Sequence, residues 1–262
     1  MSFISDPGRT DCRQDTSAGS RKLLLPVNDS PALFSHHTIS IGDNTIHQIC
    51  MPLADTAVLH KIGQIHNIFL PDNIRQSRHK RQTEFIAGRL AAKYALLQYG
   101  YSNFNLKTGS QGQPLFPESL QGSLSHTSNQ RQCLAIACVQ KKQPTHRYLG
   151  IDIEYRQHQS IMNEHKSTLT LFLRAAELRY ITEHSTDLPL MALLLFSAKE
   201  SIIKAWFHQY QKLINFTDIA FQSYRHSYLN FLIDSPLTHA NPQTAEVCFH
   251  CTKEKIITIA YI

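Results

Sequence analysis

The stretch YLGIDIEY, residues 148–155, is an apolar run that carries two acids two positions apart. A short run of this kind, rich in β-branched and aromatic residues, predicts a buried β-strand. Side chains alternate across a strand, so Asp152 and Glu154 emerge on one face and the isoleucines on the other. Two like charges roughly 7 Å apart on such a strand are unfavourable unless a cation lies between them or the strand end reaches solvent. The spacing alone leaves both explanations open.

The stretch FSAKESIIKAW, residues 196–206, continues an apolar run that predicts a helix. On a helix, Glu200 and Lys204 lie one turn apart on the same face, and Lys199 falls on a neighbouring face. An ordinary surface ion pair, worth a few tenths of a kcal/mol, explains this spacing as well as a catalytic pair does.

The stretch SRHKRQTEFIAGRLAAKYAL, residues 77–96, predicts a helix with a basic start. Arg81 and Arg89 are eight positions apart, hence on one helix face and about 12 Å from each other. Lys80 adds charge beside Arg81. This face suits an anion, although a solvated basic face is the plainer explanation.

The stretch GSLSH, residues 122–126, lies in a region rich in turn-forming residues, just before a predicted strand. Ser125 and His126 can present a hydroxyl and an imidazole to an anion. A Ser-His pair in a loop is a weak signal by itself.

The remaining pattern indicates an α+β protein with two lobes that meet near residues 140–150. We expect a flexible, polar tail over residues 1–36. Helices are predicted at residues 77–99, 168–184 and 190–210, with Pro189 in the first turn of the last. Strands are predicted at TIHQICMPL, QCLAIACV, YLGIDIEY, FTDIAFQSY, SYLNFLID, AEVCFHC and KIITIAYI.

The composition limits partners and location. A net charge of +6 and a pI near 9.0 favour an anionic partner. Cys248 and Cys251 flank His250, but a structural zinc site needs a second ligand pair, so we expect reduced, mostly buried thiols. No secretory signal is visible, and no apolar run is long enough to span a bilayer. A cytoplasmic location is therefore expected, with peripheral membrane association left open.

Taken together and in this order, four motifs resemble those of the 4′-phosphopantetheinyl transferases, in the siderophore-synthase type typified by enterobactin synthase component D. The motifs are K-R-x-x-E-x-x-x-G-R (80–89), GSLSH (122–126), GIDIE (150–154) and FSAKESIIK (196–204). The resemblance runs from about residue 70 to the end. It implies a pseudo-dimer of similar α+β halves, with an N-terminal lobe at 37–145 and a C-terminal lobe with the metal site at 146–262.

The resemblance also implies the reaction. These enzymes move the phosphopantetheine arm of coenzyme A to a carrier-protein serine and release adenosine 3′,5′-bisphosphate. By analogy, Asp152, Glu154 and Glu200 would hold Mg²⁺, Glu200 would act as general base, directly or through water, and Lys204 would stabilise charge on the phosphate. Ser125 and His126 would contact the pyrophosphate.

Further analogies concern the nucleotide and the partners. Lys80, Arg81 and Arg89 would bind the 3′-phosphate of coenzyme A, with Lys204 also on the cofactor. Partners would be apo aryl, peptidyl or acyl carrier domains and components of a siderophore synthase, with no nucleic acid. Acidic carriers would be attracted by the positive charge.

Two other functions are weighed against this one. A Mg²⁺-dependent hydrolase of nucleotides or nucleic acid would use the same acids, but it does not explain why GIDIE and FSAKESIIK occur together. A basic nucleic-acid-binding module fits the charge, yet no zinc-finger, RNP or KH signature is present. An inactive relative is disfavoured, because every motif acid and lysine is in place.

Overall fold

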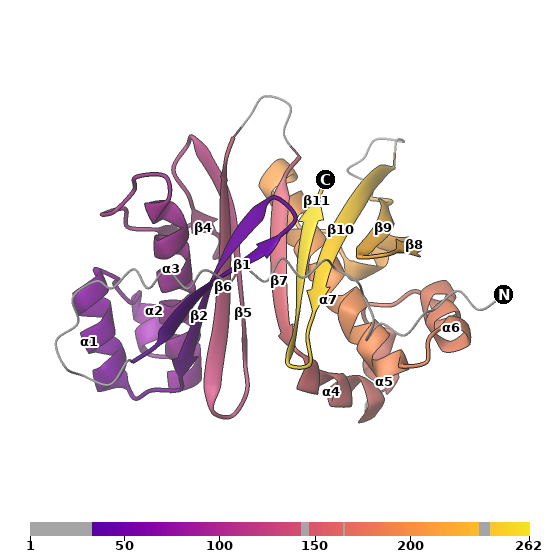
Figure 1. The fold of residues 1–262 in the computed structure, drawn as a ribbon, viewed down its shortest axis with the longest axis horizontal. Coiled ribbons are helices and arrows are strands. Elements are labelled where there is room, and N and C mark those ends of the chain that lie inside the picture. Colours follow the sequence, from indigo (N-terminus) through magenta and orange to yellow (C-terminus); the bar gives the residue numbers. More distant parts are fainter. Residues whose placement is uncertain (1–32, 143–146, 165, 236–241) are drawn as a thin grey trace. The chain divides into compact units, whose positions relative to one another are not determined.

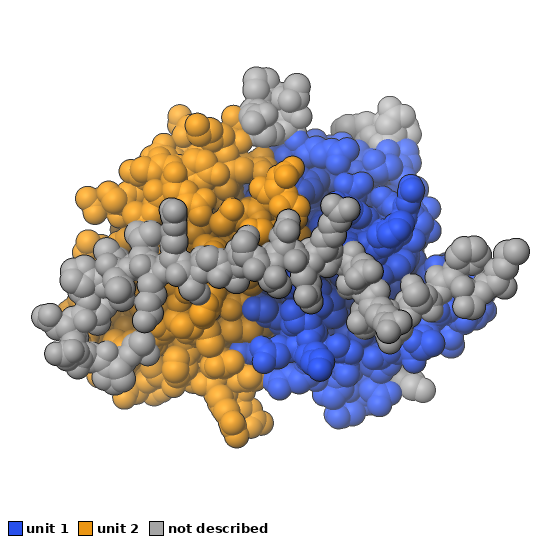
Figure 2. All heavy atoms as spheres, viewed as in Figure 1, with its two compact units in different colours: residues 1–14, 144–262 blue, residues 15–143 orange. Residues whose placement is uncertain are grey.

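The computed structural model describes residues 33–142, 147–164, 166–235 and 242–262 (Figure 1). These residues fall into two compact units, coloured separately in Figure 2. Unit 2 contains the described residues up to 142, and unit 1 contains those from 147 onward. Each unit combines helices with an antiparallel sheet, so the α+β class expected from the sequence is confirmed. Most of the tail expected at 1–36 lies outside the described residues, but its last two residues already belong to strand β1.

Unit 2 is built on a four-stranded sheet in the order β1-β2-β6-β5. Its strands are β1 (Ser35–Ile41), β2 (Asn44–Pro52), β5 (Leu120–Ser128) and β6 (Gln132–Lys141), and β3 (Lys107–Thr108) pairs with β4 (Pro114–Leu115). Its helices are α1 (Thr56–His66), α2 (Asp72–Arg75) and α3 (His79–Leu97). Helix α3 packs across β2, β5 and β6, as Figure 1 shows. The buried face of this helix, which includes Ile86 and Leu90, therefore packs on a sheet.

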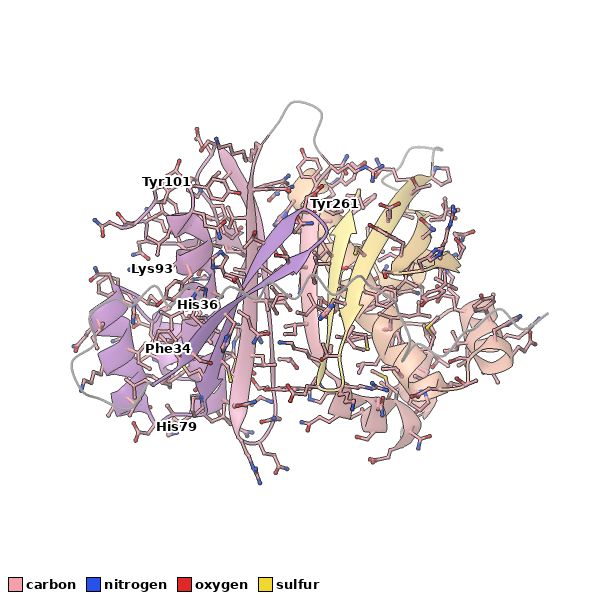
Figure 3. The ribbon with its side chains drawn as sticks, viewed as in Figure 1. Phe34, His36, His79, Lys93, Tyr101 and Tyr261 are labelled. Carbon is pink, nitrogen blue, oxygen red and sulfur yellow. The ribbon has the colours of Figure 1, made fainter. Side chains whose placement is uncertain are left out.

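One edge of unit 2 carries an aromatic stack. His36 on β1, labelled in Figure 3, stacks on Tyr94 of α3 with ring centroids 4.0 Å apart. Its Nε2 lies 3.0 Å from Nδ1 of His47 on β2, and Gln98 hydrogen-bonds the other nitrogen of His47. His47 is only 4 % exposed. Burial is the main cause that lowers the pKa of His47 to about 4, and the neighbouring His36 lowers it further.

Unit 1 is built on a five-stranded sheet in the order β7-β11-β10-β9-β8. Its strands are β7 (Leu149–Tyr155), β8 (Ile219–Arg225), β9 (Tyr228–Ile233), β10 (Gln243–Cys251) and β11 (Lys255–Tyr261). Its helices are α4 (Gln159–Glu164), α5 (Lys166–Leu169), α6 (Ala175–His184) and α7 (Leu188–Tyr210), with 3₁₀ turns η1 (Arg156–His158) and η2 (Phe216–Asp218). Helix α7 packs against β7, β11 and β10.

Gly150 lets α7 and β7 meet backbone to backbone. A Cβ atom at this position would lie 1.9 Å from the Ser201 carbonyl oxygen and 2.6 Å from the Ala205 nitrogen. No side chain fits in that space, because these neighbours are main-chain atoms that cannot rotate away. The close approach brings residues 151–154 beside the middle of α7.

Most predicted elements are present, and two expectations were wrong. The helices predicted at 77–99 and 190–210 correspond to α3 and α7, with Pro189 in the first turn of α7. The helix predicted at 168–184 is interrupted, because Phe172 and Leu173 turn into the core before α6 begins. The GSLSH stretch is not a loop but lies inside strand β5. Helix α1, which begins at an Asp55 cap, was not predicted.

The cysteines of the described residues are free thiols. Cys133 and Cys138 are buried, and burial raises the pKa of each to about 12. Cys248 and Cys251 are half-buried.

Candidate active site

The acidic site of unit 1 comprises Asp152, Glu154 and Glu200, and Asp152 is the most firmly held of the three. It sits on β7 and is 3 % exposed. Lys204 Nζ donates to its Oδ1 over 2.7 Å, and Ser197 Oγ donates to its Oδ2 over 2.8 Å. Both donors come from α7, one full turn on each side of Ser201, whose carbonyl approaches Gly150. The contact between backbones therefore places a buried carboxylate between two donors of one helix.

Glu200 lies on the same helix and interacts electrostatically with the other two acids. It is partly buried, and its pKa is raised, mainly by burial and further by the negative charges of Asp152 and Glu154. The positive charge of Lys204 opposes this rise. In the described part of the chain, no hydrogen-bond donor contacts the Glu200 carboxylate. The structure thus brings together the three carboxylates that the sequence singled out.

Glu154 is the second acid of β7 in this site. Its Oε2 lies 2.9 Å from Nδ1 of His158, which belongs to the 3₁₀ turn that follows β7. Both side chains are partly buried, with 18 % and 24 % of their surfaces exposed. Glu154 and Asp152 lie on the same face of β7, as strand alternation predicts.

Lys199 has a structural position that the sequence did not reveal. It is fully buried, and its ammonium donates to Glu177 Oε2 over 2.7 Å and to the Phe172 carbonyl over 2.8 Å. Glu177 on α6 also accepts from the backbone N–H groups of Arg174 and Phe221. The Lys199–Glu177 ion pair therefore joins α6 and the start of β8 to α7, at the residue next to Glu200. Helical spacing gave no signal for it, because the partner lies 22 residues away.

The donors of the acidic site are suited to a divalent cation. Among the residues that the structure describes, no three His, Cys, Asp or Glu side chains form a ready-made metal site. The chemistry of the donors nevertheless fits a hard cation, because carboxylate oxygens are its usual ligands and the charges of Asp152 and Glu154 contribute to the raised pKa of Glu200. In this structure the Lys204 ammonium supplies the positive charge at Asp152.

The basic residues of unit 2 form a second cluster. Arg81 Nη1 on α3 lies 3.0 Å from His126 Nε2 on β5. Glu84 lies beneath both, 3.5 Å from Arg81 and 4.0 Å from His126, and accepts a hydrogen bond from Ser128. The side chain of Arg81 is 49 % exposed. The structure therefore unites Arg81 with His126, two residues that the sequence placed in separate motifs.

Arg89 occupies a buried position near this cluster. It is 8 % exposed, lies over the Phe85 ring at 4.6 Å and donates to Thr108 over 2.7 Å. Its Nε is buried with no hydrogen-bond partner among the described residues. Burial, followed by the charge of Arg81, lowers its pKa to about 10. An uncompensated buried guanidinium of this kind is suited to an anion.

The other two predicted residues of unit 2 differ in placement. Lys80 is exposed at the start of α3. Ser125 is 6 % exposed and precedes His126 on β5, so the two side chains point to opposite faces of the sheet. His126 faces α3, as its contact with Arg81 shows, and Ser125 faces away from that helix.

Two families match this chain. Residues 70–138 match the 4′-phosphopantetheinyl transferase N-terminal domain, and residues 148–260 match the 4′-phosphopantetheinyl transferase superfamily. The second match contains both β7 and α7, with all residues of the acidic site. The first contains Arg81, Arg89 and His126.

Curated relatives agree with these matches. The chain is 32 % identical to enterobactin synthase component D of Salmonella austin over 178 residues, which cover 66 % of this chain and 67 % of that protein. It is 36 % identical to the protein of the same name from Escherichia coli (strain K12) over 132 residues, 50 % of this chain and 58 % of the other. It is 30 % identical to 4′-phosphopantetheinyl transferase PptT of Mycobacterium tuberculosis over 145 residues, 55 % of this chain and 60 % of the other.

No helix among the described residues is long and apolar enough to cross a membrane.

Proposed function

This chain belongs to the 4′-phosphopantetheinyl transferase superfamily, and from that premise we propose that it transfers the phosphopantetheine arm of coenzyme A to a carrier-protein serine. The observation that carries the proposal is the meeting of Asp152, Glu154 and Glu200, with Lys204 beside them. Transfer from coenzyme A breaks a pyrophosphate bond and releases adenosine 3′,5′-bisphosphate. A polyanion of this kind needs positive charge and fixed geometry at the reacting phosphate.

Asp152, Glu154 and Glu200 are the residues that would hold Mg²⁺. When bound, the cation would neutralise the pyrophosphate and orient it for attack. Mg²⁺ usually binds through one or two carboxylates and completes its shell with water and phosphate, and the strand and helix of this site offer such oxygen ligands. Asp152 is already fixed by two donors, so its position does not depend on the cation.

Glu200 is the proposed general base. The carrier serine must lose a proton as its oxygen attacks the β-phosphate. Burial and two neighbouring acids raise the pKa of Glu200, which makes it a better proton acceptor than an exposed carboxylate. The proton passes to Glu200 directly or through a water molecule.

Lys204 is proposed to stabilise negative charge on the transferred phosphate or on the leaving bisphosphate. Its Nζ donates to the Ile151 carbonyl and to Asp152, which hold the ammonium at the acidic site. A positive charge fixed before the reaction costs no reorganisation during it.

In unit 2, we assign the phosphates of coenzyme A to the basic cluster and its neighbours. Arg81 and Arg89, with Lys80, are proposed for the 3′-phosphate, and His126 with Ser125 for the pyrophosphate. The buried Nε of Arg89 has no hydrogen-bond partner in the described part of the chain, which supports this assignment, because a phosphate oxygen can satisfy such a donor. Ser125 has the weakest structural support, since it points away from Arg81 and His126.

The proposed carriers are aryl, peptidyl or acyl carrier domains of siderophore synthesis. Two of the relatives described above are named enterobactin synthase component D, which favours a siderophore synthase as the partner. The net charge of +6 suits an acidic carrier. We expect the reaction to take place in the cytoplasm.

The deciding experiment is mass spectrometry of carriers after incubation with the full chain, coenzyme A and Mg²⁺. Apo aryl, peptidyl and acyl carrier domains are compared, and at least one should gain one phosphopantetheine group. The Asp152→Ala variant is the control and should give no gain. Carriers that stay unmodified, with phosphate released from nucleotides instead, would point to a hydrolase and overturn the proposal.

A further inference from the structure

Two buried hydroxyl groups surround the inner oxygen of Asp152. Ser197 on α7 is 0 % exposed, and Thr258 on β11 is also 0 % exposed. Thr258 lies directly opposite Asp152 in the pairing of β11 with β7. The Ser197 and Thr258 hydroxyl oxygens are 3.0 Å apart. A strand neighbour and a helix residue thus meet behind the carboxylate.

The available protons fix the direction of these hydrogen bonds. Each hydroxyl has one proton to donate. Thr258 Oγ1 is 2.9 Å from the Ser197 carbonyl oxygen, which can only accept. Ser197 Oγ is 2.8 Å from Asp152 Oδ2, a carboxylate oxygen that accepts when it is ionised. The consistent assignment is that Thr258 donates to the Ser197 backbone while Ser197 donates to Asp152.

We infer that Ser197, held by Thr258, is a positioning residue for the metal ligand Asp152. Its hydroxyl binds Oδ2 and Lys204 binds Oδ1, so the two donors fix the orientation of the carboxylate that would hold the cation. The inference rests on the proposed function, since it assumes that Asp152 is a ligand. Both hydroxyls are fully buried, so we assign them no direct part in the reaction. Partners that orient a ligand in this way typically change metal affinity about 10- to 100-fold when removed.

The chain contains a matched control on the same helix. Ser201 is also 0 % exposed, but its hydroxyl donates to the Ala198 carbonyl within α7, one turn away. Replacing Ser201 by Ala removes a buried hydroxyl of the same size and leaves the contacts of Asp152 intact. Any loss that both variants share is therefore a loss of helix packing.

The test measures Mn²⁺ binding to the full chain in the presence of coenzyme A, by the electron paramagnetic resonance signal of free Mn²⁺. A titration of coenzyme A alone supplies the blank. We expect Ser197→Ala to bind Mn²⁺ about 10- to 100-fold more weakly than the wild type. Ser197→Thr keeps the hydroxyl and should stay within about threefold, and Ser201→Ala should match the wild type.

Several results would overturn the inference. Wild-type Mn²⁺ affinity in folded Ser197→Ala would do so, as would an equal loss in Ser197→Thr or Ser201→Ala. If Ser197→Ala does not fold, Thr258→Val decides. It keeps the shape of threonine, should weaken Mn²⁺ binding about threefold, and overturns the inference if its binding is unchanged.

A parallel transfer assay separates this inference from the proposed function. In Ser197→Ala, the Mg²⁺ concentration for half-maximal rate should rise, and saturating Mg²⁺ should restore most of the turnover. If the wild type modifies carriers while Ser197→Ala binds metal normally, only the positioning role fails. If the wild type neither modifies a carrier nor binds Mn²⁺, both fail.

Discussion

In unit 1 the Asp152 carboxylate is 3 % exposed and receives hydrogen bonds from a buried serine and a lysine, on a strand whose backbone touches a helix. In unit 2 the Arg81 side chain is 49 % exposed and contacts His126 and Glu84 near the surface. Packing builds the acidic site, so a change there disturbs the fold or the chemistry. Charge at a solvated surface builds the basic cluster, so a change there alters affinity and its dependence on salt.

The strongest test of this difference between the two units adds one methyl group to a glycine in each of them. Gly150→Ala places a Cβ 1.9 Å from a backbone oxygen of α7, whereas Gly88→Ala on α3 meets only the end of the Leu124 side chain at 3.6 Å. We expect Gly150→Ala to lose about 3 kcal/mol or more in the free energy of unfolding. Gly88→Ala should be neutral or up to about 1 kcal/mol more stable, because alanine favours the helix. Urea unfolding measures both, and equal stabilities would contradict the packing argument.

The next change removes a charge from the acidic site without changing its shape. Glu200→Gln should lower kcat at least about a hundredfold, because an amide cannot accept the serine proton. Glu183 is an exposed acid on α6, so Glu183→Gln is the control and should have the kcat of the wild type. A near-normal kcat for Glu200→Gln would remove the proposed base.

Acid should affect unit 2 through its buried histidine stack. The pKa of His47 is lowered to about 4 in the folded chain, and that of an unfolded histidine is about 6.5. Below about pH 6.5, His47 is protonated in the unfolded chain but stays neutral in the folded chain. The free energy of unfolding therefore declines until about pH 4, where folded His47 is also protonated. Between pH 7 and pH 5 the loss from this group should be about 2 kcal/mol.

Urea unfolding of the wild type and His47→Gln at both pH values isolates that contribution. Other groups titrate in both proteins, so the difference between their pH slopes is the quantity of interest. Identical slopes would mean that His47 is not held neutral by burial.

The smallest effect is expected at the surface of unit 2. Arg81→Ala should raise the KM for coenzyme A about tenfold at low salt, the cost of one charge-assisted hydrogen bond, and leave kcat unchanged. The increase should shrink as salt screens the charge. With dephospho-coenzyme A as substrate, the wild type and the variant should have the same KM if Arg81 binds the 3′-phosphate. Lys61→Ala, exposed on α1, serves as control. A salt-independent loss of kcat would contradict the comparison.

Local patterns in the sequence predicted much of the fold. Apolar runs indicated β6, β7, β10 and β11, and helical spacing with Pro189 indicated α7. The same local logic put Asp152 and Glu154 on one face and Glu200 one turn from Lys204. These features depend only on the periods of strands and helices.

The features that the sequence could not reveal depend on distant partners. Ser197 meets Thr258 across 61 residues, and Arg81 meets His126 across 45. The sequence showed only that Lys199 lies on a different helix face from Glu200, because Glu177, its buried partner, lies on another helix. The interruption near Phe172 likewise follows from burial in the core rather than from helix propensity. Spacing does not encode which surfaces meet in three dimensions.

The contact at Gly150 has a consequence for protein engineering. Strand β7 and helix α7 are also joined by Lys204 to the Ile151 carbonyl and by His208 to the Leu149 carbonyl. The chain between them, residues 156–187, can be regarded as an exchangeable insert. A chimaera that borrows this insert from another transferase should retain the reacting groups if it also keeps His158 beside Glu154 and Glu177 opposite Lys199.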